Sequence, residues 1–253
     1  MTVVFELKNL NKRFGDNVIY EDMNLEIEEG ETFAIIGGSG MGKSVCLKLM
    51  IGLLPYEGGH VRFKGKEVGD MNREELRELR RHVSMVFQAG ALFDSMSVLE
   101  NVTYALREHT KMSDQEMLER AKECLDMVGL GYDPDIINRM PAGLSGGMRK
   151  RVALARSIAI KPEVILYDEP TTGLDPANIK RIGEMIKKLQ KELKVTSVVV
   201  THDMPIAFDC SDRIAMLWDK KFPYIGTPDQ IKSHPAEEVR DFVEGRYDEN
   251  KAE

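Results

Sequence analysis

An apolar segment that leads directly into a glycine-rich loop is the feature that most restricts how this chain can fold. Residues 32–36 (TFAII) form an unbroken apolar run of the kind that becomes a buried strand in a parallel sheet. Residues 37–44 (GGSGMGKS) then match the phosphate-loop pattern GxxxxGK[ST], and apolar residues that predict a helix follow them. This order of strand, loop and helix predicts an α/β fold with a phosphate-binding loop.

The residues of this loop have separate expected roles. Its glycines let the backbone wrap around phosphate groups, so that successive N–H groups face the negative charge. Lys43 is expected to reach the β- and γ-phosphates, and Ser44 to bind Mg²⁺. The expected nucleotide contacts in this segment are Gly37, Gly38, Ser39, Gly40, Met41, Gly42, Lys43, Ser44 and Val45.

A second apolar run ends in two acids, which a nucleotide-hydrolysing site with such a loop requires. Residues 164–167 (VILY) predict a strand, and Asp168 and Glu169 follow it. Ligands of open parallel sheets bind at the carboxyl ends of the strands, so both acids are expected beside the loop. Asp168 is expected to hold Mg²⁺, directly or through water, and Glu169 to polarise the attacking water as general base.

Two more polar residues follow predicted strands and are expected at the same edge of the sheet. His202 follows residues 197–201 (SVVVT) and could hydrogen-bond the γ-phosphate. Gln88 follows residues 83–87 and could bring its amide to the metal ion or to the attacking water. Each alone would be an ordinary structural or capping residue, so the catalytic roles rest on the combination.

The alternation of strands and helices is interrupted once, which indicates an insertion into one domain. Residues 89–141 show helical patterns only, including a capping box at Ser113, whereas strands and helices alternate before and after. We therefore predict a discontinuous core of residues 1–88 and 142–227 around a helical subdomain, residues 89–141. Residues 228–253 form the expected tail, with two short helices within 228–243 and a frayed polar end at 247–253. The remaining predicted strands are 3–7, 17–20, 25–27, 61–63 and 214–217, and the remaining predicted helices are 73–81, 177–193, 204–208 and one that begins at residue 146.

Taken together, these segments resemble the ATP-binding subunit of ABC transporters. Phe14 resembles the aromatic residue that stacks on adenine, although a core phenylalanine is the alternative. Residues 144–148 (LSGGM) resemble the family signature at the end of the helical subdomain, and residues 172–175 (TGLD) resemble the D-loop. The resemblance implies a P-loop NTPase fold of the ABC ATPase type, with an N-terminal antiparallel β subdomain, an inserted helical subdomain, and ATP and Mg²⁺ as cofactors.

The resemblance also implies that a second copy of the chain stacks head to tail on the first. Each ATP then lies between the phosphate loop of one copy and the signature of the other. Ser145, Gly146 and Gly147 begin a helix and so present hydrogen-bond donors to an anion, but no lysine follows them at phosphate-loop spacing. These three residues and Asp175 of the D-loop are the remaining expected nucleotide contacts.

Three short stretches resemble one branch of the family. Met148 stands where a glutamine is usual, and residues 88–98 (QAGALFDSMSV) and 242–245 (FVEG) are similar to the Mla/Mce branch, whose members move lipids between bacterial envelope membranes. This resemblance implies an integral-membrane permease as partner, with a small regulatory subunit and a periplasmic lipid-binding Mce-type protein as further partners. It places the chain at the cytoplasmic face of the bacterial inner membrane.

An apolar stretch after Gln88 could receive a coupling helix of the permease. Residues 91–93 (ALF) lie near Met85, Met96 and Met112, and methionines suit adaptable contacts with a helix. A place in the core of the helical subdomain is an equal alternative for Leu92 and Phe93, and the core is favoured for Met85. The tail helices could dock a regulator or the second copy, or could simply cover the sheet.

Composition excludes several other classes of protein. No run approaches the roughly 18 apolar residues of a membrane span, and the N-terminus lacks the pattern of a secretory signal, so a cytosolic chain with three reduced, packed cysteines is expected. The net charge of −7 argues against a nucleic-acid partner.

An importer of another cargo stays open. A soluble ABC ATPase of DNA repair or translation is disfavoured because the chain has no long coiled coil and only one copy of each motif, and a kinase or GTPase would leave the signature without a role.

Overall fold

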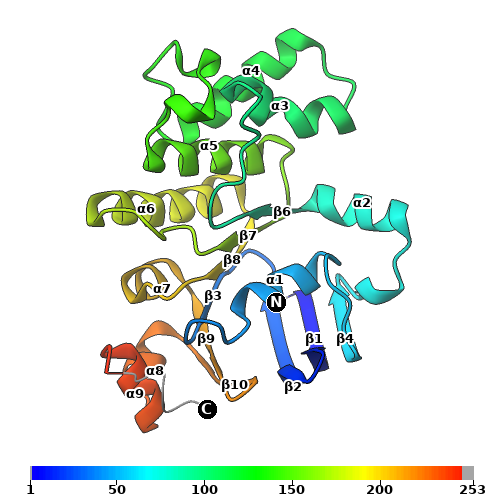
Figure 1. Cartoon of the computed structure of the whole chain (residues 1–253), viewed down its shortest axis with the longest axis vertical. Helices are drawn as coiled ribbons and strands as arrows, with labels where there is room; N and C mark the ends of the chain where they lie inside the picture. The colour runs from blue at the N-terminus through cyan, green and yellow to red at the C-terminus, as the bar shows by residue number, and fades with distance from the viewer. Residues whose placement is uncertain (1, 247–253) are drawn as a thin grey trace.

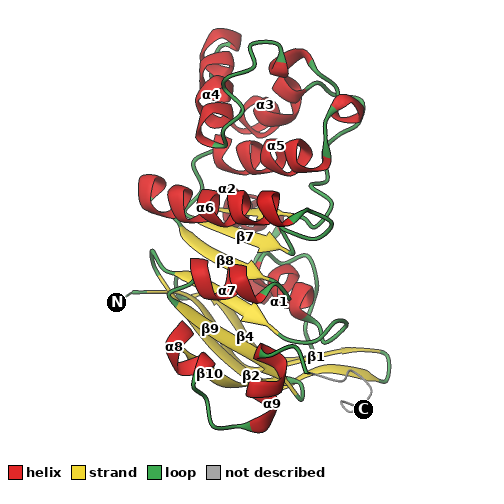
Figure 2. Cartoon of the chain, turned by 90° about the vertical axis from the view of Figure 1, so that its left-hand side faces the viewer, coloured by secondary structure: helices red, strands yellow, loops and turns green. Residues whose placement is uncertain are grey.

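The computed structural model describes residues 2–246, and two β-sheets organise this part of the chain (Figures 1 and 2). The smaller sheet is antiparallel, with the strand order β2-β1-β4-β5. Its strands are β1 (Val3–Phe14), β2 (Asn17–Glu28), β4 (Gly58–Phe63) and β5 (Lys66–Glu67). This sheet is the antiparallel β subdomain that the resemblance implies.

The prediction of three short strands before residue 28 is wrong, because these residues form one hairpin of two long strands. The turn between β1 and β2 contains Gly15, whose φ of 60° suits a glycine. The pairing shifts register between Leu7 and Leu10, and such bulges interrupt the apolar alternation that a single strand would show. The polar residues within these two strands therefore resemble the ends of shorter strands.

The larger sheet has six strands in the order β10-β9-β3-β8-β7-β6, and all its neighbours pair in parallel except β10 with β9. Its strands are β3 (Thr32–Ile36), β6 (Val83–Val86), β7 (Val164–Asp168), β8 (Thr196–Val200), β9 (Arg213–Trp218) and β10 (Lys221–Gly226). The edge strand β10 was not predicted, since Pro223 and the exposed Lys221 weaken its pattern.

Helices cover the larger sheet and form a separate layer at one end of the molecule. Figure 1 shows α3 (Val98–His109), α4 (Asp114–Met127) and α5 (Gly146–Ala159) at the end opposite the small sheet. Residues 89–141 of the described chain contain no strand. The other helices are α1 (Lys43–Met50), α2 (Arg73–His82), α6 (Pro176–Leu193), α7 (Met204–Cys210), α8 (Pro228–Lys232) and α9 (Glu237–Val243), with 3₁₀ turns at Val68–Asp70, Ile136–Asn138 and Pro141–Gly143.

Alternating residues of the central strand β3 divide the core. Phe33 and Ile35 pack with α1 and the small sheet on one face. Ala34 and Ile36 pack with α7 and the tail helices on the other face, so the tail helices cover the sheet. Because α1 is held between the two sheets, the loop before it is fixed at the carboxyl end of β3.

The remaining predictions about the chain's interior are confirmed where the structure describes them. The three cysteines, Cys46, Cys124 and Cys210, are free and buried. Met85 packs against the core on the α1 side, as expected. The predicted frayed end, residues 247–253, lies outside the described residues. No helix among residues 2–246 combines the length and the apolar character needed to cross a membrane.

Candidate functional site

A cavity of about 370 Å³ opens at the carboxyl ends of β3, β6, β7 and β8, where the sequence predicted a nucleotide site. Four distant segments of the chain contribute to its walls. Its lining residues are Ser39, Gly40, Gly42, Lys43, Ser44, Val45, Gln88, Glu169 and His202. The phosphate loop, both predicted partners from neighbouring strands and the predicted base thus meet in one place.

The backbone of the phosphate loop needs glycine at two positions. Gly37 has a φ of 150°, and a Cβ atom there would lie 2.8 Å from the carbonyl oxygen of Leu217. Gly42 has a φ of 105°, and a Cβ atom there would lie 2.4 Å from Cγ2 of Ile19. Any side chain at either position would push the loop away from β9 or from β2.

Two side chains hold this loop in its curved conformation through hydrogen bonds to its backbone. The Lys43 ammonium donates to the carbonyl oxygens of Gly37 at 3.0 Å and Gly38 at 2.9 Å, which draws the start of the loop towards α1. The buried hydroxyl of Tyr20 on β2 donates to the carbonyl oxygen of Gly42 at 2.5 Å. Burial raises the pKa of Tyr20 well above its usual value, so this hydroxyl keeps its proton and donates.

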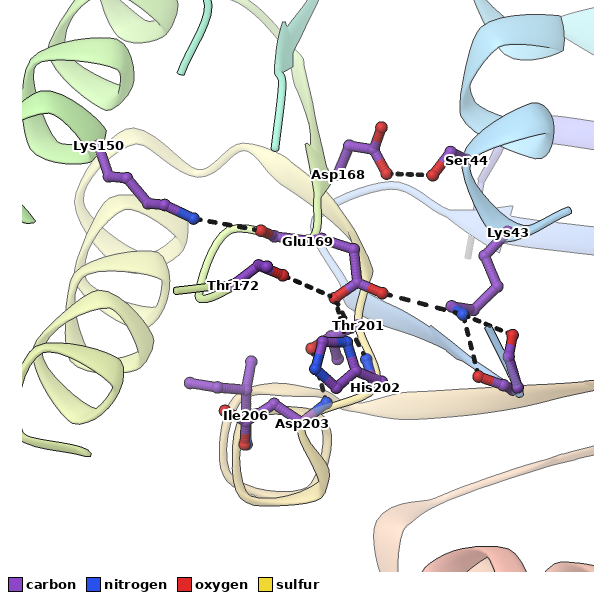
Figure 3. Close-up of polar contacts among 12 residues, drawn as sticks. Lys43, Ser44, Lys150, Asp168, Glu169, Thr172, Thr201, His202, Asp203 and Ile206 are labelled. Carbon is purple, nitrogen blue, oxygen red and sulfur yellow. Dashed lines mark hydrogen bonds and ion pairs between the residues drawn. The ribbon is translucent and has the colours of Figure 1, made fainter. Parts of the chain in front are cut away.

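Ser44, which lines the cavity, contacts Asp168 at the end of β7. The Ser44 hydroxyl donates to Oδ1 of Asp168 at 2.5 Å, although 124 positions separate the two residues in the sequence (Figure 3). A hydroxyl and a carboxylate supply the oxygen ligands that Mg²⁺ prefers, with room for water and phosphate oxygens to complete its shell. Gln88 lines the same cavity with an exposed side chain. These oxygen donors fit a Mg²⁺ site.

Glu169 is buried, and its side chain is surrounded by donors. Its Oε2 lies 2.7 Å from Nδ1 of His202, and its Oε1 lies 3.8 Å from the Lys43 ammonium (Figure 3). Its φ of 48° is unusual for a non-glycine residue, and its N–H donates to the carbonyl oxygen of Val200 at 2.9 Å. Such strain at a cavity wall is typical of a functional position, here one that directs a carboxylate towards His202 and Lys43.

Lys150 of α5 approaches the same residue from the helical layer. Its ammonium lies 3.5 Å from the backbone carbonyl oxygen of Glu169 (Figure 3). Burial lowers the pKa of Lys150, and the negative charge of Glu169 opposes that effect. Lys150 and Tyr20 were both missed in the sequence, since each acts through a contact with a distant segment that no local pattern reveals.

The other predicted contact residues lie outside the lining of this cavity. Phe14 is 47% exposed, which rules out the core alternative, and the Lys12 ammonium lies 4.7 Å from the centre of its ring. Ser145 caps α5 by accepting the Met148 N–H at 3.3 Å. Asp175 caps α6, and a hydrogen bond from the side-chain amide of Asn178 lowers the pKa of its carboxyl.

Gly146 and Gly147 begin α5 beside this cap. Gly146 is exposed, and nothing lies within 4 Å of the place where its Cβ atom would be. Gly147 is buried, and a Cβ atom there would lie 3.0 Å from Oδ1 of Asn178. The signature therefore exposes its backbone at Gly146, and its residues do not line the cavity at the chain's own phosphate loop.

Comparison with known proteins identifies relatives that are ATP-binding proteins of transport systems. Residues 20–172 match the ABC transporter family model. The chain is 39% identical to the probable ribonucleotide transport ATP-binding protein mkl of Mycobacterium leprae, over 97% of this chain and 70% of that protein. It is 38% identical to the intermembrane phospholipid transport system ATP-binding protein MlaF of Haemophilus influenzae, over 97% of this chain and 92% of that protein. It is also 38% identical to the methionine import ATP-binding protein MetN of Clostridium tetani, over 95% and 74%.

A solved structure shares the fold. The ATP-binding cassette MJ0796, seen as a dimer in a post-hydrolysis state bound to ADP and Pi, superposes with a TM-score of 0.81 at 36% identity, over 88% of this chain and 98% of that chain. The chain therefore belongs to the ABC transporter family, in which it is an ATP-binding subunit with ATPase activity.

Proposed function

We propose that this chain powers the movement of phospholipid or another lipid between the membranes of a bacterial envelope. The observation that carries this proposal is the similarity to MlaF, 38% identical along 92% of that protein's length. The segments 88–98 and 242–245 and the LSGGM signature support the same branch. The comparable identity to mkl and MetN means that cargo needs a direct test.

In the proposed site the phosphate loop binds the triphosphate and Glu169 acts as general base. The backbone N–H groups of the loop and Lys43 hold the β- and γ-phosphates. Ser44 and Asp168, with Gln88, would hold Mg²⁺, which would supply charge neutralisation at the phosphate oxygens. The Glu169 carboxylate takes a proton from the attacking water, and His202 fixes its orientation through the contact of 2.7 Å.

Phe14 is proposed to bind the adenine. Its ring is exposed at the end of β1, and the Lys12 ammonium, which is anchored by Glu57 at 2.9 Å, lies over the ring. A base can stack on an exposed aromatic face without any hydrogen-bond readout, which is worth about 1–3 kcal/mol per base. The adenine end and the phosphate end of the nucleotide would then rest on two adjoining parts of the same chain.

A second copy of the chain is proposed to complete each site. The signature residues Ser145, Gly146 and Gly147 are absent from the lining of the chain's own cavity, yet they form a helix start at which Ser145 and Gly146 are exposed. Such a start binds anions well, so these residues are suited to the γ-phosphate of a nucleotide held by the other copy, with Asp175 of the D-loop proposed to lie at the same interface. The dimer of the related cassette MJ0796 supports this arrangement.

The surface after Gln88 is proposed to bind a membrane permease. Phe93 is 41% exposed, and its ring stacks in a tilted arrangement on the ring of Tyr104 at 4.8 Å. Leu92 and Met112 instead pack partly against the core, so only Phe93 and Tyr104 form a clear apolar surface. Through this permease the chain would lie at the cytoplasmic face of the inner membrane, with a small regulatory subunit and a periplasmic Mce-type protein as further partners.

The test is purification of the tagged chain from detergent-solubilised membranes, followed by mass spectrometry of the proteins and lipids that remain bound. We expect a permease and a lipid-binding periplasmic protein to be retained. Phe93→Glu should release both proteins, whereas Tyr132→Glu, at a position 74% exposed in another loop, should not. Recovery of an amino-acid permease without bound lipid would contradict the lipid proposal and favour a MetN-like importer.

A further inference from the structure

One guanidinium of α5 binds the backbone of the segment that follows Gln88. Arg156 donates from Nη1 to the carbonyl oxygen of Ala91 at 2.8 Å and from Nη2 to that of Gly90 at 2.9 Å. The centre of the guanidinium also lies 5.8 Å from the centroid of the Phe93 ring. Two short charge-assisted hydrogen bonds and an aromatic contact thus hold residues 90–93 on this helix.

The segment that Arg156 holds has a strained backbone. Gly90 and Ala91 have φ values of 79° and 46°, so two successive residues lie in the left-handed region. Ala91 pays a steric penalty of about 1–2 kcal/mol in this conformation, because it has a Cβ atom. Gly90 is buried against α5, where a Cβ atom would be in contact with Cβ of Ala153 at 3.4 Å. Such a conformation persists only where surrounding contacts impose it.

Gln88 depends on this segment for its position. Its side chain is exposed at the cavity wall, and among residues 2–246 no hydrogen bond holds its amide. The backbone around it is set by a turn in which the N–H of Gly90 donates to the carbonyl oxygen of Phe87 at 2.8 Å. The backbone position from which the Gln88 side chain extends is therefore set by the turn that Arg156 secures.

Asn101 supports the other end of the same segment. This fully buried residue accepts the N–H of Phe93 at 2.8 Å and donates to the carbonyl oxygens of Phe93 and Met96. The segment 90–96 is thus attached at one end to α5 and at the other to α3. Arg156 holds the residues that are nearer in sequence to Gln88.

We propose that Arg156 is a positioning residue, which directs Gln88 into the nucleotide cavity by holding residues 90 and 91 on α5. It touches neither the nucleotide nor the metal ion and acts only through this turn. The inference rests on the proposed role of Gln88 at the Mg²⁺ site. It also gives the permease-binding residue Phe93 and the metal-binding residue Gln88 a common anchor on the helix that begins with the signature.

The test compares Arg156→Gln and Arg156→Lys with Arg151→Gln as a matched control. Arg151 lies on the same helix and donates from Nη1 to the carbonyl oxygen of Gly129 at 2.9 Å, the distance at which Arg156 binds Gly90. Gly129 lies in a loop that does not line the cavity. Binding of a fluorescent ATP analogue is titrated with Mg²⁺ and also measured in EDTA. Hydrogen exchange of the amides of residues 88–97 is followed without nucleotide.

We expect Arg156→Gln to raise the Mg²⁺ concentration for half-saturation about tenfold, equivalent to 1.4 kcal/mol, and to leave binding in EDTA unchanged. Exchange of residues 88–97 should accelerate, and Arg156→Lys should restore part of both effects. In a double-mutant cycle, Gln88→Ala should remove most of the effect of Arg156→Gln on Mg²⁺.

Three results would overturn the inference: equal effects of Arg156→Gln and Arg151→Gln, additive effects in the cycle, or unchanged exchange in residues 88–97. If Arg156→Gln does not fold, the comparison of Arg156→Lys with Arg151→Lys decides on the same criteria. A wild-type chain that binds the analogue without any dependence on Mg²⁺ would refute the proposed Mg²⁺ site itself. That outcome is distinct from a Mg²⁺-dependent wild type whose Arg156 variants behave like the control.

Discussion

The substitution Glu169→Gln tests the proposed chemistry most directly, since it removes one charge and changes little else. The backbone at this position has an unusual φ of 48°, and its N–H donates to the Val200 carbonyl oxygen. Glutamine can keep both features. The amide oxygen can still accept from His202. A loss of activity would therefore report the missing carboxylate rather than a displaced loop.

The substitution should have two effects, a lower kcat and a tighter binding of ATP. Loss of a general base lowers kcat by about 10²–10⁴-fold, which corresponds to about 3–5 kcal/mol in the activation free energy. The carboxylate lies 3.8 Å from the Lys43 ammonium, where two charges at an effective dielectric constant of about 20 attract by roughly 4 kcal/mol before desolvation is subtracted. Without this competitor Lys43 is more available to phosphate, so the variant should bind ATP more tightly while hydrolysing it far more slowly.

The assay combines phosphate release with light scattering. We expect the variant to remain near 28.6 kDa with ADP and to reach twice that mass with ATP and Mg²⁺. Glu192→Gln, at an exposed position on α6, should behave like the wild type. If kcat falls by less than tenfold, Glu169 is not the base. If the mass does not rise with ATP, the site shared between two copies is wrong.

Three further predictions concern the phosphate loop, the adenine contact and the core. Lys43→Ala should reduce phosphate release below detection, and unchanged release would refute the phosphate-loop assignment. Phe14→Ala should raise KM for ATP about tenfold at nearly constant kcat, since an exposed ring that stacks on a base contributes about 1–3 kcal/mol; an unchanged KM would refute the adenine contact. Burial raises the pKa of the Cys46 thiol to about 12 and those of the Cys124 and Cys210 thiols to about 11 from 9.0. The unfolded chain thus loses these protons first, and urea melts should show stability falling above about pH 9, by about 1.4 kcal/mol per thiol at pH 10; a flat profile between pH 8 and 10 would contradict this burial.

Local patterns predicted the parts of the site that are contiguous in sequence. The phosphate loop, Asp168 and Glu169 follow apolar strands, and parallel strands place their carboxyl ends together. This argument was enough to predict that Gln88 and His202 would line the same cavity as Lys43. The contact between His202 and Glu169 was not predicted, because its direction depends on the unusual backbone at Glu169.

Contacts between distant segments could not be predicted in the same way. The Tyr20 hydroxyl and the Arg156 guanidinium each bind a backbone carbonyl oxygen of another element, and backbone carbonyls leave no trace in the identity of a residue. The hairpin of β1 and β2 was divided incorrectly because bulges broke its alternation. The signature could be recognised as a helix start, but its exposure away from the chain's own cavity needed the fold.

The bond between Tyr20 and Gly42 has a consequence for how the molecule can move. Tyr20 lies on β2, which pairs with β1, and β1 ends at Phe14. If Phe14 holds the base, then the base contact and the phosphate loop are both attached to the β1–β2 hairpin, which fixes the distance between them. A nucleotide of the wrong length would reach only one of these two contacts. We therefore expect any closure upon ATP to occur by displacement of the α3–α5 layer, while the distance between Phe14 and the phosphate loop stays constant.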